Sequence, residues 1–355
     1  MKQAGLADAA ATFAHALIAW QRVHGRHGLP WQASRHPYGV WLSEIMLQQT
    51  QVVTVKEYFN RFMLRFPTVA DLANATLDDV LAMWSGLGYY SRARNLHRCA
   101  QILVSDYGGQ FPPSSAQLLQ LPGIGPSTAA AIAAFCFGER VSIMDANVQR
   151  VLGRYLAFDA DLSSQKNVAL LWKKATDLLP PTGASEAIAN YTQALMDLGA
   201  SICSVKAPQC LLCPVQQGCA ANAFGKPCSY PVKTRKLKRT SQSLWLLCLT
   251  REDGAAWLEQ RPTPGVWAGL YAFALFDDEA SALGLLSSLQ KPQVEAKPAI
   301  KHVLTHKDLY LHPLHLQVSF EQAQAICQTR SGRWLLPQDF RQIGLPAPMA
   351  RMLGI

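Results

Sequence analysis

The spacing of apolar residues changes once along the chain and divides it into two parts. Over residues 1–222, Ala-rich and Leu-rich stretches recur at helical intervals between Pro and Gly residues, which predicts a mostly helical domain. Its first helix is expected around residues 9–20. After residue 243 the pattern changes, and short apolar runs at 244–249, 255–259 and 309–316 predict strands. The last third of the chain is therefore expected to be a separate α+β domain.

A basic segment, residues 223–243, separates the two parts. It contains no acidic residue, and Pro227 and Pro231 interrupt any helix. Its basic residues are Lys226, Lys233, Arg235, Lys236, Lys238 and Arg239. This composition predicts an extended linker, which serves either as a solvated spacer or as a contact to phosphate groups along a duplex.

Composition and charge narrow the possible classes of protein. The 355 residues are 49% hydrophobic and 16% charged, which is enough apolar material for two cores. The formal net charge of +9 favours a polyanionic partner, although charge alone does not single out nucleic acid. No apolar run is long enough to cross a membrane, and residues 9–20 lack the flanks of a signal peptide. These features predict a cytoplasmic protein that does not associate with membranes.

Four cysteines lie close together in the segment C-SVKAPQ-C-LL-C-PVQQG-C. They are Cys203, Cys210, Cys213 and Cys219. Without signs of export, disulfides are disfavoured. Zinc sites usually contain two short C-x₂-C pairs, whereas this segment contains one such pair with longer gaps on both sides. The uneven spacing favours a [4Fe–4S] cluster and leaves zinc as the alternative.

The spacing C-x₆-C-x₂-C-x₅-C resembles the cluster loop of the endonuclease III and MutY family of DNA glycosylases. A second motif, L-P-G-I-G-P-S-T at 121–128, precedes an Ala-rich stretch at 129–137. Alone, its two glycines fit an ordinary connection between helices. The whole motif resembles the helix–hairpin–helix signature of the family, which implies that Gly123 and Gly125 expose backbone N–H groups to phosphate. Lys206, in the cysteine segment, is expected to contact phosphate as well.

Ser127 distinguishes two reaction types within this family. Relatives that also cleave the strand carry a Lys at this position, which attacks the sugar C1′ and forms a Schiff base. A serine hydroxyl cannot form one. The resemblance therefore implies a monofunctional glycosylase that leaves an abasic site, with Ser127 in the catalytic region.

Glu44 lies beside apolar residues on a predicted helix, four residues after Val40 and three after Trp41. Gln48 and Gln51 are expected one and two turns later, as a polar stripe. An apolar environment raises the pKa of a carboxyl group, as a general acid near neutral pH requires. Alone, the pattern also fits a half-exposed Glu. The run W-L-S-E-I-M-L-Q-Q-T resembles a MutY motif in which this Glu is the catalytic acid.

Asp145 precedes a predicted helix, which is the position of an N-cap residue. Helix N–H groups are expected to keep its carboxylate ionised. The run D-A-N-V-Q-R-V, which includes Asn147, resembles the catalytic Asp segment of the family. The resemblance implies that Glu44 protonates N7 of adenine while Asp145 faces the positive charge on the sugar. Whether the intermediate is bonded to Asp145 or only shielded by it stays open.

Further residues match positions that, in the family, contact the flipped base or fill the gap that it leaves. These residues are Trp31, Gln48, Gln49, Leu87, Tyr89 and Gln193. Trp31 and Gln193 are expected in the adenine pocket, where an amide can pair with the base edge. Gln49 and Tyr89 are expected to insert into the duplex with Leu87 beside them. Without the resemblance, Tyr89 is typical of a core aromatic residue.

The C-terminal part resembles the Nudix-like domain of the same family at 257–262 and 265–271. Residues 273–290 lack the Arg and paired Glu with which a hydrolytic Nudix enzyme holds metal, so a binding module is expected. In the family, a Phe-Ser-His loop of this domain recognises 8-oxoguanine. The matching loop here is Leu304-Thr305-His306, which keeps a hydroxyl and replaces the aromatic ring.

Together, these motifs predict a multidomain protein. An all-α helix–hairpin–helix DNA glycosylase domain at 1–222, with a cluster loop, is expected to contain a six-helix lobe at 31–139 and a cluster lobe at 1–30 and 140–222. A Nudix-like α+β domain is expected at 244–355. The implied function is base excision repair by a monomeric bacterial enzyme at the nucleoid, which removes adenine mispaired with 8-oxoguanine or guanine in double-stranded DNA.

Two other functions stay open at this point. One is a bifunctional enzyme of the endonuclease III type that acts on oxidised pyrimidines, against which Ser127 and Glu44 argue. The other is a DNA-binding protein or iron–sulfur sensor without catalysis, in which replacing Glu44 would change no reaction.

We predict that borohydride traps no covalent complex between this protein and a duplex carrying adenine opposite 8-oxoguanine. Reduction captures a Schiff base, and the Ser127 hydroxyl cannot form one. Denaturing electrophoresis measures the complex, and a bifunctional enzyme with Lys at this position is the positive control. A trapped band with this protein would contradict the monofunctional assignment.

Overall fold

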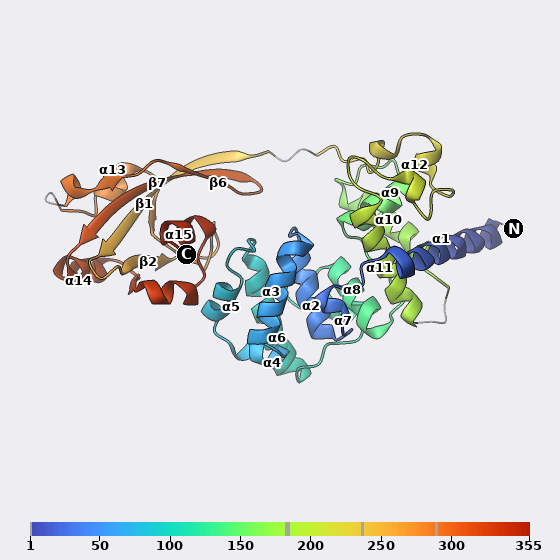
Figure 1. The fold of residues 1–355 in the computed structure, drawn as a ribbon, viewed down its shortest axis with the longest axis horizontal. Coiled ribbons are helices and arrows are strands. Elements are labelled where there is room, and N and C mark those ends of the chain that lie inside the picture. Colours follow the sequence, from blue (N-terminus) through green and yellow to red (C-terminus); the bar gives the residue numbers. More distant parts are fainter. Residues whose placement is uncertain (1, 182–184, 236–237, 288–289) are drawn as a thin grey trace. The chain divides into compact units, whose positions relative to one another are not determined.

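The computed structural model describes residues 2–181, 185–235, 238–287 and 290–355 (Figure 1). Contacts divide the chain into two compact units. The first unit contains Met1–Ala73 and Arg98–Arg235, and the second contains Asn74–His97 and Lys236–Ile355. Lys236, which belongs to the predicted basic linker, lies outside the described residues. Because it includes Asn74–His97, the second unit contains a short stretch of the part of the sequence that is predicted to be helical.

The chain is mostly helical up to Ser229, as the spacing of its apolar residues predicts. Its helices are α1 (Lys2–His24), η1 (Pro30–Gln32), α2 (Pro37–Leu47), α3 (Val52–Arg65), α4 (Val69–Asn74), α5 (Leu77–Met83), α6 (Ser91–Tyr107), α7 (Ser115–Leu118), α8 (Pro126–Phe137), α9 (Ala146–Tyr155), α10 (Gln165–Asp177), α11 (Ser185–Ser201), η2 (Cys210–Leu212), α12 (Ala220–Ala223) and η3 (Pro227–Ser229).

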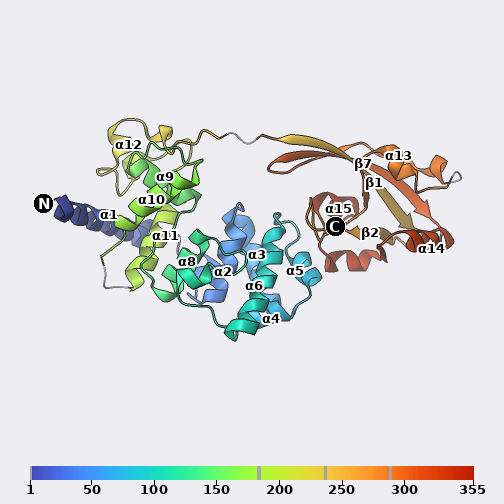
Figure 2. The ribbon, with the colours of Figure 1, turned by 180° about the vertical axis from the view of Figure 1, so that it is seen from behind.

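Helix α8 lies at the centre of the first unit, in contact with α2 and α11, as both views of the ribbon show (Figures 1 and 2). It has no polar face, and residues 128–134 are all buried. The hairpin before it turns at Gly123, where φ is +79°, a conformation that favours glycine. The helix begins at Pro126, earlier than the sequence pattern predicts, and ends at Gly138 with φ +68°.

Helices α1, α8, α9, α10 and α11 share a hydrophobic core. Its members include Phe13, Leu17, Val148, Leu152 and Leu198. This packing places the start of α9, which Asp145 caps, against the last turn of α11, where Gly199 approaches Asn147. The N-terminal helix therefore packs with α9 and α11.

The segment predicted to be an extended linker is only partly so. Thr234 bonds to Asp161 through both its hydroxyl and its N–H, and Val232 accepts a hydrogen bond from Leu162 N–H at 2.9 Å. These bonds attach residues up to Arg235 to the first unit. Strand pairing begins at Thr240, earlier than the run 244–249 predicts. Local composition gave no sign of these contacts because their partners lie about 70 residues earlier in the chain.

The second unit is built on a mixed sheet, and it contains the three predicted strands. Its strands are β1 (Thr240–Arg251), β2 (Ala256–Gln260), β3 (Tyr271–Ala272), β4 (Ala274–Phe276), β5 (Glu295–Ala296), β6 (Ile300–Val303), β7 (Lys307–Val318) and β8 (Arg333–Leu335). Its helices, besides α5, are α13 (Glu279–Leu283), η4 (Lys291–Gln293), α14 (Phe320–Thr329), η5 (Pro337–Gln342) and α15 (Ala347–Met352).

The sheet is organised around β1 and β7, which run parallel over their whole length. The main order is β3-β2-β1-β7-β5, and β6 forms an antiparallel hairpin with β7. Leu247 and Leu249 on β1 pack with Leu314 and Leu316 on β7 in the core. Within the part of the chain that the structure describes, no helix has the length and apolarity needed to cross a bilayer.

We predict that Gly199→Ala lowers the free energy of unfolding of the first unit by about 1–3 kcal/mol. A Cβ at Gly199 on α11 would lie 2.6 Å from Cβ and 3.2 Å from Cα of Asn147, so the start of α9 must move. Urea unfolding followed by circular dichroism measures the change. Gly28→Ala is the matched control, because nothing lies within 4 Å of a Cβ added there. Equal unfolding midpoints for the two variants would contradict this packing.

Candidate active site

A pocket of about 370 Å³ in the first unit gathers several of the predicted functional residues. Glu44 from α2, Trp31 from η1 and Gln193 from α11 line it together. Arg26, which sequence reasoning did not single out, lines it as well. The volume lies in the range of roughly 300–1,000 Å³ typical of small-molecule sites. Residues far apart in the sequence thus form one concave site around a carboxyl group.

Glu44 has a strongly altered acidity in this pocket. Burial, and secondarily the negative charge of Asp145, raise its pKa from 4.5 to about 8. No hydrogen bond from the described residues offsets these effects. The carboxyl group therefore keeps its proton at neutral pH and can donate it to a bound base.

The polar stripe predicted after Glu44 does not form. Helix α2 ends at Leu47, Gln48 is its C-cap residue, and Gln51 is the N-cap residue of α3. Gln48 and Gln51 therefore do not follow Glu44 along one helix face. The apolar periodicity could not reveal this end, because no Gly or Pro marks it.

Asp145 is the N-cap residue of α9, as its position predicts, and its Oδ1 accepts a hydrogen bond from Val148 N–H at 2.7 Å. Burial raises the pKa of Asp145, while the N–H groups of Val148 and Asn147 act against this shift. Asp145 does not line the pocket itself, but its charge acts on Glu44. The two carboxyl groups are therefore electrostatically coupled.

Ser127 and Asn147 hold the backbone and helix around Asp145. The Ser127 Oγ on α8 accepts a hydrogen bond from Met144 N–H at 3.1 Å, directly before Asp145. The Asn147 Oδ1 accepts one from Arg150 Nη2 at 2.9 Å. Neither side chain lines the pocket. Their contacts place Asp145 at the junction of α8 and α9.

The four cysteines line one small cavity of about 30 Å³ beside α9. Arg154, 3% exposed, donates to Cys203 Sγ at 3.3 Å and to the carbonyl oxygens of Ser204 and Val205. Arg150 donates to the carbonyl oxygen of Cys203 at 2.8 Å. Two arginines of the helix that Asp145 caps thus bind the cysteine segment.

Cys228 is a fifth thiol near this segment, and sequence reasoning overlooked it. Its Sγ donates to the carbonyl oxygen of Lys206 at 3.5 Å. Cys228 lies outside the spaced motif, so the spacing could not indicate it. It lies near the cysteine segment only because the chain returns there at η3.

Gln49 and Tyr89 share an unusual backbone conformation. Their φ angles are +58° and +47°, which residues other than glycine rarely adopt and which costs about 1–3 kcal/mol. Gln49 is exposed, and Tyr89 is 41% exposed, so the interpretation of Tyr89 as a core aromatic residue is wrong. Leu87, close to Tyr89 in the chain, is buried at 5% exposure.

In the second unit, Leu304, Thr305 and His306 form the tip of the β6–β7 hairpin. They line a pocket of about 490 Å³ together with Tyr89. The hydroxyl groups of Tyr89 and Thr305 are hydrogen-bonded to each other. Two predicted substrate contacts from distant parts of the sequence therefore meet in this unit.

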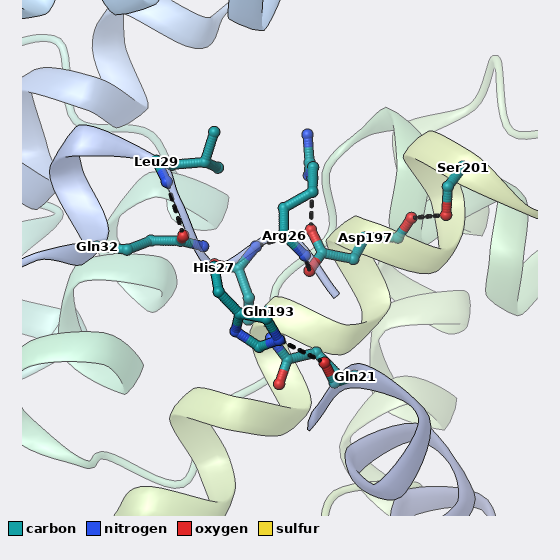
Figure 3. Close-up of polar contacts among 8 residues, drawn as sticks. All are labelled: Gln21, Arg26, His27, Leu29, Gln32, Gln193, Asp197 and Ser201. Atoms are coloured by element: carbon teal, nitrogen blue, oxygen red, sulfur yellow. Dashed lines mark hydrogen bonds and ion pairs between the residues drawn. The ribbon is translucent and has the colours of Figure 1, made fainter. Parts of the chain in front are cut away.

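Gln193 donates a hydrogen bond to Asp197, which in turn is paired with Arg26 (Figure 3). Sequence reasoning assigned no role to Arg26 or Asp197. Asp197 is 1% exposed and follows Gln193 by one turn of α11. It accepts hydrogen bonds from both of the other side chains. The one-turn spacing was visible in the sequence, whereas the pairing with Arg26 was not.

Comparison with known proteins identifies the family. The model of the HhH-GPD superfamily of base excision DNA repair proteins matches residues 42–176, and a NUDIX domain model matches residues 245–354. An adenine DNA glycosylase of Buchnera aphidicola subsp. Baizongia pistaciae is 34% identical over 346 residues, which cover 96% of this chain and 95% of the relative. The chain belongs to the adenine DNA glycosylase family.

Other members and neighbours agree with this assignment. Human adenine DNA glycosylase is 32% identical over 97% of this chain and 73% of its own length. A thermostable thymine-DNA glycosylase superposes with a TM-score of 0.54 at 27% identity, over 61% of this chain and 98% of its own. Endonuclease III, at a TM-score of 0.50 and 21% identity, shows the fold alone. As a family member, the protein is a DNA N-glycosylase of base excision repair, as the motifs predicted.

We predict that Glu44→Gln stabilises the protein near pH 8 by about 2–4 kcal/mol and has little effect near pH 4. The folded carboxyl group keeps its proton up to about pH 8, whereas the unfolded one loses it near pH 4.5, so wild-type stability falls between these values. Gln has no proton to lose.

Urea unfolding at several pH values measures this difference. Glu186→Gln is the matched control, because Glu186 lies in the same pocket but is exposed. A gain in stability that does not depend on pH would contradict the raised pKa of Glu44.

Proposed function

We propose that this protein is a monofunctional glycosylase that removes adenine mispaired with 8-oxoguanine or guanine in double-stranded DNA. The observation that carries the proposal is the pairing of two coupled carboxyl groups with opposite tasks. Glu44 keeps its proton at neutral pH and lines a pocket of suitable size. Asp145 accepts backbone N–H bonds that favour its charged form. Membership in the adenine DNA glycosylase family supports the choice of adenine.

In the proposed reaction, Glu44 donates its proton to N7 of a flipped adenine. The bond between C1′ and N9 then breaks, its electron pair goes to the base, and adenine leaves as a neutral molecule. Positive charge develops on the sugar, where the carboxylate of Asp145 stabilises it. The Glu44 carboxylate takes a proton from water as the water oxygen bonds to C1′. The products are adenine and an abasic site.

Residues around Glu44 and in two exposed turns are proposed to contact the flipped base and the duplex. Trp31 and Gln193 would bound the base in the Glu44 pocket. Gln49 and Tyr89 would fill the gap in the duplex, and their strained, exposed backbone is typical of functional residues. Gln48 would support Gln49 from the end of α2.

Phosphate contacts are proposed at two loops of the first unit. The Gly123 to Gly125 hairpin precedes the N-terminus of α8, and an added Cβ at Gly125 would meet nothing within 4 Å, so a phosphate can approach. Lys206 is exposed on the cysteine segment. A net charge of +9 favours DNA as the partner.

Recognition of the base opposite adenine is proposed for the second unit. Leu304, Thr305 and His306 line its pocket with Tyr89, so the residue that would enter the duplex lies beside the hairpin tip. Thr305 can offer a hydroxyl and His306 a ring nitrogen to 8-oxoguanine. Lesion contact at this tip would explain a preference for 8-oxoguanine over guanine.

We further propose that Cys203, Cys210, Cys213 and Cys219 hold a [4Fe–4S] cluster. All four line one cavity, and Arg154 donates a hydrogen bond to Cys203 Sγ. Such a cluster would cross-link the segment that carries Lys206.

That the protein is a monomer in a bacterial cytoplasm stays a prediction.

The proposal predicts strand breaks at adenine opposite 8-oxoguanine that appear only after alkali treatment. Glu44→Gln should reduce the excision rate at least 100-fold, because the base loses its proton donor. The wild-type rate should fall as pH rises through about 8, since Glu44 then ionises. Gel analysis of an end-labelled duplex measures both effects.

Glu186→Gln, at the mouth of the same pocket, should keep the wild-type rate. Duplex binding without any breaks would favour a DNA-binding protein without catalysis. Breaks without alkali would favour a bifunctional enzyme.

A further inference from the structure

The carboxylate of Asp197 is a buried acceptor that the proposed reaction does not use, and it is bonded to Gln193, which lines the base pocket (Figure 3). Its Oδ1 accepts from Arg26 Nε at 2.7 Å and from Gln193 Nε2 at 2.9 Å. Its Oδ2 accepts from the backbone N–H of Arg26 at 3.0 Å. With its side chain 2% exposed, the carboxylate has these three donors and little contact with water.

These bonds decide which end of the Gln193 amide faces the base. A carboxylate paired with a guanidinium group has no proton to donate, so it can face only the NH₂ end of the amide. The amide oxygen then lies at the opposite end, in the pocket that Gln193 lines with Glu44. Among the described residues, none donates a hydrogen bond to this oxygen.

An amide fixed in this way distinguishes purines by their group at C6. Adenine carries an amino group there, which can donate to the Gln193 oxygen. Hypoxanthine carries a carbonyl oxygen at the same position, which would face the amide oxygen with no proton between them. A free amide could rotate by 180° and serve either base. A fixed amide leaves hypoxanthine with an unpaired acceptor, which is a strong basis for rejection.

We propose that Asp197 is a positioning residue that sets base specificity, because it holds the Gln193 amide with its oxygen toward C6 of the bound purine. Arg26 supports this role because its backbone N–H and its Nε both donate to the carboxylate, which links the chain after α1 to α11. The inference rests on the proposed function, since it places adenine in this pocket. N7 is the same in both purines, so the proton donor Glu44 does not itself discriminate between them.

The test is the ratio of single-turnover excision rates for adenine and for hypoxanthine, each opposite 8-oxoguanine, with the full-length protein. Comparing this ratio between variants cancels the different intrinsic lability of the two nucleosides. Asp197→Asn should lower it about tenfold or more, because an amide can donate as well as accept and both orientations of Gln193 become available. Gln193→Met should lower it similarly. The double variant should show no further loss, because Asp197 acts through Gln193.

Ser201→Ala is the matched control. Ser201 Oγ bonds to the backbone carbonyl oxygen of Asp197 at 2.7 Å and leaves the carboxylate untouched. The ratio should stay at the wild-type value. Circular dichroism and unfolding midpoints establish that each variant is folded, and Gln193→Met, which changes a pocket wall, still tests the proposal if Asp197→Asn does not fold.

An unchanged ratio in Asp197→Asn, with adenine excision merely slower, would overturn the proposal and leave Asp197 a structural role. An unchanged ratio in Gln193→Met would overturn it as well. Failure of the proposed function looks different, since the wild-type protein would then release no adenine. Wild-type excision of adenine with a ratio that no variant moves would refute this inference alone.

Discussion

The site depends on the partial burial of two coupled carboxyl groups, which cannot both be charged at low cost. Asp145 receives N–H groups from the start of α9, which favour its anion. Glu44 receives none from the described residues, and the charge of Asp145 adds to the effect of burial. The proton therefore resides on Glu44. The proposed roles, an acid that faces the base and an anion that faces the sugar, rest on this difference in surroundings.

Helices α9 and α11 connect this pair to the rest of the first unit. Arg150 bonds to Gly199 on α11 and to Cys203 in the cysteine segment, while Arg154 binds the next carbonyl groups of that segment. The helix that Asp145 caps is thus held at its middle and in its last turn. A group bound by the cysteines would stabilise the same helix, which would relate the proposed cluster to Asp145 without giving the cluster a chemical step.

The motifs and the change of period were sufficient to predict the helical domain, the three main strands and three of the residues that line the pocket in the first unit, which are Trp31, Glu44 and Gln193. They failed where tertiary contacts decide the outcome. The end of α2 carries no local signal, so the Gln48 stripe was wrong. Arg26 and Asp197 are 171 residues apart, and no spacing rule relates them. Tyr89 is an aromatic residue of the kind usually found in a core, and only its positive φ and its exposure show that it lies outside one.

The protonation state of Glu44 is the central claim, and infrared difference spectroscopy between the wild type and Glu44→Gln tests it directly. The account predicts that the wild type has an additional protonated carboxylic C=O band at pH 7, which disappears as the pH passes about 8. An ionised carboxylate band at pH 7, with no protonated carboxyl group lost in the variant, would contradict it. Glu44 would then lack the proton that the reaction requires.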